Sequence, residues 1–106
     1  MIMQGGGLRM KLVIDIDGTI CSQEADYSQA KPFTERISKF NAAYDAGDTI
    51  VYFTARGTET GIDWEQVTMD QFKEWGVKYH QLLFGKPAAD LYIDDKAWRP
   101  ENDIHR

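Results

Sequence analysis

Two carboxylates at the end of a short apolar run are the residues of this chain best suited to chemistry. Residues 12–14 are Leu-Val-Ile, and Asp15 and Asp17 follow with Ile16 between them. Such a run is typical of a strand buried on both faces of a parallel sheet, and strand side chains alternate, so both acids point the same way. Like charges this close repel each other, and a bound divalent cation is the usual remedy. The pair therefore indicates a cation site, with two solvated acids at a polar strand end as the alternative.

Polar residues of kinds that handle phosphate also follow the later apolar runs. Gly18 and Thr19 turn the chain off the first strand, so the two acids lie at its C-terminal end, where open α/β sheets bind ligands. The corresponding residues after the second, third and fourth runs are Thr54, then Lys86, then Asp94 with Asp95. Singly, each has an ordinary explanation: a turn residue, a surface lysine and an acidic loop. Because the ends of parallel strands converge on one edge, the four together predict a common site.

Alternating strands and helices are predicted to position these residues. The strands cover the run from residue 12 to the two acids, then residues 49–53, 79–84 and 91–93. Apolar residues spaced three and four apart predict a first helix that has Pro32 in its first turn and stops at Gly47. A second helix is predicted from an N-cap at Asp63, with Gln66 completing a capping box, to Gly76. The order strand, helix, strand, helix, strand, strand predicts a three-layer α/β/α domain with a mainly parallel sheet.

Length and composition set broad limits. A chain of 106 residues supports one core, and we expect a single domain over residues 10–106 behind a flexible leader, residues 1–9. The net charge of −5 argues against nucleic acid or an anionic membrane as the main partner. No apolar run approaches the roughly 20 residues that span a bilayer. Cys21 is the single cysteine and forms no internal disulfide, so we expect the reducing cytoplasm.

These motifs resemble those of the haloacid dehalogenase superfamily of phosphohydrolases, over the stretch from Met10 to Pro100. The four motifs of that family are matched by Asp15-Ile16-Asp17-Gly18-Thr19, by Thr54, by Lys86 and by Asp94-Asp95. Small bacterial members, often described as capsule or lipopolysaccharide biosynthesis phosphatases, are similar in Phe53-Thr54-Ala55-Arg56-Gly57, Gly85-Lys86-Pro87 and Tyr92-Ile93-Asp94-Asp95-Lys96-Ala97. The resemblance implies a Rossmann-like fold, reduced to the core of the superfamily without its cap domain.

The resemblance also implies a mechanism, the hydrolysis of phosphomonoesters through an aspartyl-phosphate. Asp15 would be the nucleophile, and Asp17 would act as general acid and then as general base. Magnesium would be held by the carboxylates of Asp15 and Asp94 and by the backbone carbonyl of Asp17. Asp95 would belong to the outer shell of the metal or would hold Lys86 in place.

Substrate contacts follow from the same resemblance. The Thr54 hydroxyl and neighbouring backbone N–H groups, those of Gly18 and Ala55, would bind phosphoryl oxygens, and Lys86 would add a positive charge. Arg56 is a candidate for gripping the part of the substrate that does not react. The alternative for Arg56 is a surface arginine at the start of a loop.

Two departures from the superfamily stand out. The gap from Asp17 to Thr54 and the gap from Thr54 to Lys86 each hold one loop, one helix and one strand, so there is no room for a cap. The site is then open and either accepts bulky substrates or is roofed by a neighbouring subunit, and we expect a homo-oligomer. The stretch between Lys86 and Asp94 is also shorter than the dozen or so residues of an ordinary parallel crossover. Either the fourth strand is very short and reached by a direct loop, or its pairing differs from the family plan.

Three functions compete. The first is a magnesium-dependent phosphatase acting on a small phosphorylated metabolite, such as a sugar phosphate in polysaccharide biosynthesis. The second is a polynucleotide 3′-phosphatase, which the acidic net charge disfavours and a steep salt dependence of binding would favour. The third is a non-catalytic module that binds phosphate and metal without turnover.

Overall fold

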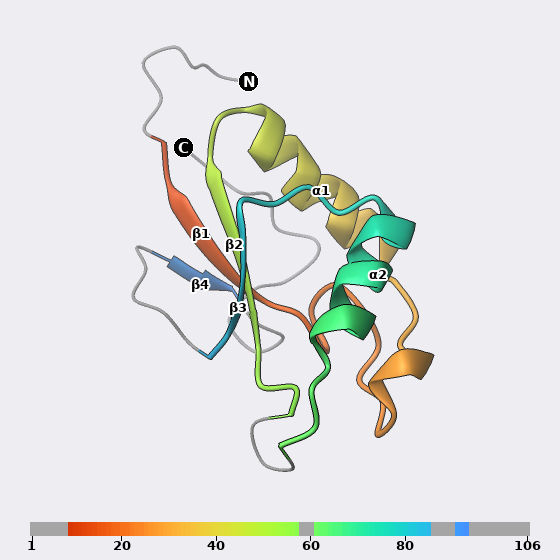
Figure 1. The fold of residues 1–106 in the computed structure, drawn as a ribbon. Helices are drawn as coiled ribbons and strands as arrows, with labels where there is room; N and C mark the ends of the chain where they lie inside the picture. The colour runs from red at the N-terminus through yellow and green to blue at the C-terminus, as the bar shows by residue number, and fades with distance from the viewer. Residues whose placement is uncertain (1–8, 58–60, 86–90, 94–106) are drawn as a thin grey trace.

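The fold follows the predicted order of strands and helices. The structure, a computed structural model, describes residues 9–57, 61–85 and 91–93, so the predicted roles of Lys86, Asp94 and Asp95 and nearly all of the expected leader lie outside the described residues. The elements are β1 (Lys11–Asp15), a 3-10 helix η1 (Tyr27–Gln29), α1 (Thr34–Asp45), β2 (Thr49–Thr54), α2 (Glu65–Trp75), β3 (Gln81–Phe84) and β4 (Leu91–Ile93) (Figure 1). The chain is a small α/β domain of Rossmann-like architecture, as predicted.

All strands of the sheet run parallel, in the order β3-β2-β1-β4. Asp15 at the end of β1 pairs with Phe53 of β2, and Thr54 pairs with Phe84 of β3. The carboxyl ends of these strands therefore meet at one edge, which is the arrangement that a common site requires. The fourth strand has three residues and pairs in parallel with β1, so the very short strand is the alternative observed.

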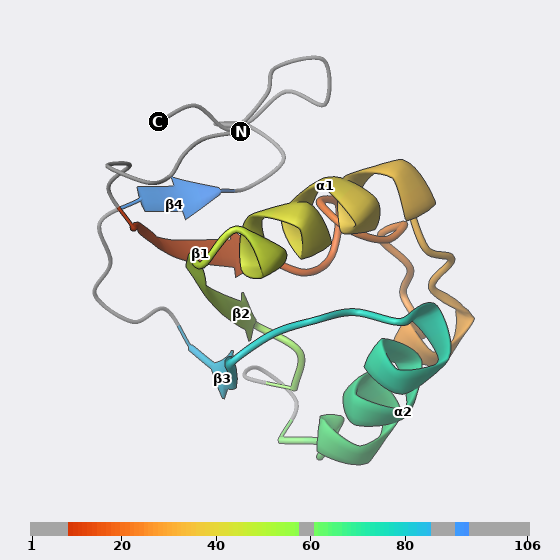
Figure 2. The ribbon, with the colours of Figure 1, turned by 90° about the horizontal axis from the view of Figure 1, so that it is seen from above.

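The described helices cover the same face of the sheet, as Figure 2 shows with α1 and α2 together on one side of the strands. Alternate residues of β1 and β2, such as Ile14 and Tyr52, pack beneath them with Ile37 and Phe40 of α1 and Phe72 of α2. Val13 and Val51 belong to the opposite alternation of these strands and are also completely buried. Among the described residues, neither helix is long and apolar enough to cross a membrane.

The start of α1 differs from the prediction. Pro32 was expected in the first helical turn, but the helix begins at Thr34 with Phe33 as its N-cap. Pro32 instead forms an isolated antiparallel bridge with Cys21, and this bridge closes the loop between them. This loop contains the short helix η1.

The capping box at the start of α2 was a wrong prediction. Trp64 is the N-cap, and its side chain makes no capping bond. The Asp63 carboxylate accepts a hydrogen bond from the N–H of Glu65 at 2.9 Å, but the amide of Gln66 donates to Asp70 at 2.8 Å instead of turning back. The carboxyl end is as predicted, since Gly76 caps the helix in the left-handed conformation.

The core beneath α2 contains one hydroxyl whose removal we expect to be harmless. Tyr52 is completely buried, its hydroxyl has no hydrogen-bond partner among the described residues, and burial raises the pKa of the phenol. We expect Tyr52→Phe to leave the free energy of unfolding unchanged or to raise it by about 1 kcal/mol, because an unpaired buried hydroxyl destabilises the fold. Urea denaturation measures the change.

The control for Tyr52→Phe is its neighbour Phe72, whose ring lies edge-on to that of Tyr52 at 5.1 Å between centroids. We expect Phe72→Ala to lower the free energy of unfolding by roughly 3 kcal/mol, because it leaves a cavity. A loss above about 1 kcal/mol for Tyr52→Phe would contradict the expectation and would mean that the hydroxyl is hydrogen-bonded.

Candidate active site

The ends of β1 and β2 bring the first predicted site residues together. Asp15 is the last residue of β1 and is half-buried. Asp17 lies just beyond the strand, with its side chain 11% exposed. Thr54 is the last residue of β2, and its hydroxyl donates a hydrogen bond to Oδ2 of Asp17 at 3.3 Å. The structure therefore brings Asp17 and Thr54 into contact at the edge of the sheet.

A buried ion pair fixes the carboxylate of Asp17. Arg56 Nη2 donates to Oδ1 at 2.8 Å, and Nε donates to Oδ2 at 3.0 Å. The guanidinium and the carboxylate are therefore joined by two hydrogen bonds, one to each carboxylate oxygen. The Arg56 side chain is completely buried in this pair. Two bonds of this kind fix both the distance and the orientation of the carboxylate.

The remaining donors of Arg56 are also used inside the protein. Nη1 donates to Thr68 Oγ1 at 3.0 Å and to Gln71 Oε1 at 2.7 Å, and the second N–H of Nη2 points to Cys21 Sγ at 3.8 Å. The guanidinium also lies over the ring of Tyr27, 4.9 Å from its centroid. A guanidinium has five N–H groups, and all five have partners here.

This arrangement corrects both expectations for Arg56. The alternative of a surface arginine is wrong, because the side chain is completely buried. The role of gripping the substrate does not fit either, because no donor of the guanidinium is left over for a ligand. Arg56 is instead a positioning residue for Asp17.

Thr68 and Gln71 of α2 were not predicted as part of the site. Gln71 Oε1 accepts a hydrogen bond from Arg56, and Gln71 Nε2 donates one to the Tyr27 carbonyl at 2.7 Å. Trp64, Thr68, Gln71 and Trp75 follow one another at spacings of four, three and four residues, so they lie on one side of the helix. Two polar residues on an otherwise apolar stripe are the signal that indicates a buried polar partner, and Arg56 is that partner.

The groups expected to bind phosphate are tied into the same loops. The Thr54 hydroxyl donates to Asp17 and accepts from the N–H of Arg56 at 3.0 Å, so it contacts a phosphoryl oxygen only by exchanging a partner. Gly18, in the left-handed region at φ 86°, donates its N–H to the Cys21 carbonyl at 2.8 Å. The N–H of Gly18 is therefore used within the turn. Ala55 follows β2 and is exposed.

The donor set at the end of β1 suits magnesium in kind. Carboxylate and carbonyl oxygens are the ligands that this cation prefers, and Asp15 offers a carboxylate at the sheet edge. The carboxylate of Asp17 is engaged by Arg56 and Thr54, which leaves its backbone carbonyl as the group for a metal. Within residues 9–57, 61–85 and 91–93, no group of three or more His, Cys, Asp or Glu side chains comes together.

Cys21 is a packed thiol and not a nucleophile. It is completely buried, and its Sγ lies 3.7 Å from the carbonyl of Ile16 and 3.6 Å from Oδ1 of Asp17. Burial, and then the nearby charge of Asp17, raises the pKa of the thiol to about 12. A thiol that stays protonated at neutral pH does not attack.

The fold and the site define a Rossmann-like α/β domain with an acidic site at the carboxyl edge of its sheet. A protein from Vibrio cholerae, an MCSG target with a crystal structure, is 30% identical to this chain, with a TM-score of 0.68. The match covers 86% of this chain and 85% of the other. The chain therefore belongs to the same family as this Vibrio cholerae protein.

A second solved structure shows the same fold at lower identity. A conserved protein from Bacteroides thetaiotaomicron is 17% identical, with a TM-score of 0.66, and the match covers 84% of this chain and 78% of the other. No family model and no curated protein matches the chain significantly. The descriptions of these two proteins name no activity.

The ion pair leads to a stability prediction. We expect Arg56→Met to lower the free energy of unfolding by about 3 kcal/mol, because it leaves Asp17 and Gln71 without their buried partner. Arg56→Lys should recover only part of this loss, since an ammonium cannot reproduce the planar fork. Urea denaturation monitored by circular dichroism measures both changes.

Lys78→Met is the matched control for Arg56→Met. Its ammonium pairs with Asp45 at 2.8 Å, but the two side chains are 49% and 58% exposed. We expect this exposed pair to contribute less than about 1 kcal/mol. If Arg56→Met cost no more than Lys78→Met, the positioning role of Arg56 would be wrong.

Proposed function

We propose that this protein is a magnesium-dependent phosphomonoester hydrolase of the haloacid dehalogenase type. The observation that carries the proposal is the meeting of Asp17 with Thr54, 3.3 Å apart at the carboxyl ends of adjacent parallel strands, beside Asp15 at the end of β1. The sequence motif around Asp15 and the convergence of the strand ends are independent features that support the same chemistry.

In the proposed reaction, a carboxylate oxygen of Asp15 attacks phosphorus and the bond from phosphorus to the leaving oxygen breaks. Asp17 enters this step as the carboxylic acid and gives its proton to the leaving oxygen. Asp17 then takes a proton from water as the water oxygen attacks the phosphoryl group, which releases phosphate and restores Asp15. When Asp17 acts as the base it is a carboxylate, and Arg56 holds it in place at that stage.

Charge neutralisation is the second requirement of this reaction, because a carboxylate and a phosphate dianion repel each other. Magnesium held by Asp15, the backbone carbonyl of Asp17 and Asp94 would supply it, with Lys86 adding a second positive charge. Asp94 and Lys86 enter here from the sequence motifs, since both lie outside the described residues. We further propose a small metabolite such as a sugar phosphate as substrate, and the cytoplasm as the compartment.

The first experiment measures phosphate release from p-nitrophenyl phosphate, with and without magnesium. We expect turnover by the wild type that depends on magnesium and a loss of at least about a thousandfold in kcat for Asp15→Asn, because the amide cannot form the covalent intermediate. A far-ultraviolet circular dichroism spectrum checks that the variant is folded.

Asp45→Asn is the matched control, because Asp45 is the last residue of α1 and its side chain is 58% exposed. We expect this variant to turn over at the wild-type rate. Equal activity of Asp15→Asn and the wild type would remove Asp15 as the nucleophile. Absence of turnover by the wild type, together with magnesium-linked binding of phosphate, would favour the non-catalytic module.

A further inference from the structure

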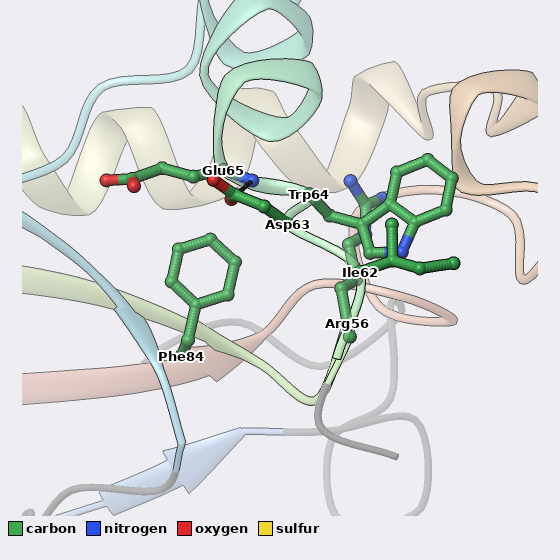
Figure 3. Close-up of a pocket in the computed structure, with 7 residues that line it drawn as sticks. Arg56, Ile62, Asp63, Trp64, Glu65 and Phe84 are labelled. Carbon is green, nitrogen blue, oxygen red and sulfur yellow. Dashed lines mark hydrogen bonds between the residues drawn. The ribbon is translucent and has the colours of Figure 1, made fainter. Parts of the chain in front are cut away.

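A hollow of about 210 Å³ lies next to the candidate active site. It is lined by Arg56, Gly57, Ile62, Asp63, Trp64, Glu65 and Phe84. Figure 3 shows the Phe84 ring rising from β3 toward Asp63 and Glu65 at the start of α2, with Ile62 and Trp64 on the side of the Arg56 loop. The hollow is therefore built from the end of β3, the loop after β2 and the beginning of α2.

The position of the hollow ties it to the reacting end of the sheet. Phe84 is the residue that pairs with Thr54 across β3 and β2, and Gly85 donates its N–H to the Thr54 carbonyl at 3.2 Å. Thr54 in turn donates to Asp17. The hollow therefore lies beside Thr54, and in the proposed reaction the rest of a substrate whose phosphoryl group contacts Thr54 would be near Phe84.

The lining of the hollow is apolar at its side walls. Phe84 is 40% exposed and Ile62 is 55% exposed, and both are large apolar residues that a fold ordinarily covers. Exposed apolar surface grouped beside polar residues marks a place where a ligand binds. A flat ring with an apolar face is the chemistry that fits the face of Phe84.

The charges around the hollow select against a second anion. Asp63 and Glu65 contribute two carboxylates at the start of α2, while the positive charge of Arg56 is matched by Asp17. Among the seven lining residues, Asp63 and Glu65 therefore carry the charges that no ion pair of the described residues balances, and both charges are negative. A leaving group that carries a carboxylate or a further phosphate meets repulsion here.

The volume of the hollow is suited to one ring. A cavity of about 150 Å³ lined by apolar side chains holds a benzene molecule, so 210 Å³ holds one six-membered ring with small substituents.

We infer that this hollow is the leaving-group subsite of the proposed phosphatase and that it takes a single uncharged ring. Phe84 and Ile62 contact the apolar face of the ring, and Asp63 with Glu65 reject substrates with a second anionic group. The inference rests on the proposed function, but binding of a ring in the hollow can be measured without turnover.

The test compares two phosphonates that the enzyme cannot hydrolyse, by isothermal titration calorimetry in the presence of magnesium. Phenylphosphonate carries the ring, and methylphosphonate does not. We expect the wild type to bind phenylphosphonate on the order of tenfold more tightly, since apolar contacts of this size discriminate by about that factor. Phe84→Ala should bring the ratio close to one.

Met69→Ala is the control for Phe84→Ala, because Met69 is a 43% exposed apolar residue of α2 that does not line the hollow. It should keep the tenfold ratio. Equal affinities of the wild type for the two phosphonates would overturn the inference, as would a ratio that Phe84→Ala leaves unchanged.

A charged ring tests the acidic rim. We expect 4-carboxyphenylphosphonate to bind several-fold more weakly than phenylphosphonate, and Glu65→Gln to narrow this gap, whereas Glu74→Gln at the exposed far end of α2 should not. Tighter binding of the carboxylated ring than of the plain ring, or tighter binding of a 3′-phosphorylated oligonucleotide than of phenylphosphonate, would overturn the inference.

The two proposals fail in different ways. A ring preference that depends on Phe84, without Asp15-dependent turnover, would reject the phosphatase and with it the leaving-group assignment, while the ring-binding site would stand. Asp15-dependent turnover without any ring preference would reject the subsite and leave the phosphatase standing.

Discussion

The ion pair between Arg56 and Asp17 is the interaction on which the rest of the site depends. A completely buried guanidinium is costly unless every donor has a partner, because desolvation removes its hydration and returns nothing. The protein meets this cost with partners from separate segments: Asp17 and Cys21 after β1, and Thr68 with Gln71 on α2. The hydrogen bonds to Arg56 in turn hold each of these partners in place.

The same pair links the layers of the fold. Asp17 follows β1, Arg56 follows β2, and their contact joins the two loops that leave the sheet edge. Gln71 then carries the network from α2 to the carbonyl of Tyr27 in η1, whose ring also packs edge-on against Trp64 at 5.1 Å between centroids. The loop after β1 is therefore fixed at two points, at the ion pair and at η1.

Much of this could be predicted from the sequence, and the part that could not has a physical reason. The strand ends carried polar residues after apolar runs, and the parallel order of strands made their convergence certain once the strands were placed. The ion pair of Arg56 with Asp17 could not be predicted in this way, because an arginine after a strand looks the same in sequence whether it faces water or a buried carboxylate. The capping box failed for a similar reason: Gln66 had another acceptor, Asp70, one helical turn further on.

The burial of Arg56 also constrains the chemistry at the sheet edge. An arginine two residues after Thr54 would be the natural group to balance a phosphate, but its charge is matched by Asp17 and its donors are all engaged. Arg56 therefore contributes order to the site and no net charge to the substrate. In the proposed reaction Asp15 and a phosphate dianion must approach each other, so their repulsion has to be balanced by cations other than Arg56. In the proposed reaction, magnesium and Lys86 would supply this positive charge.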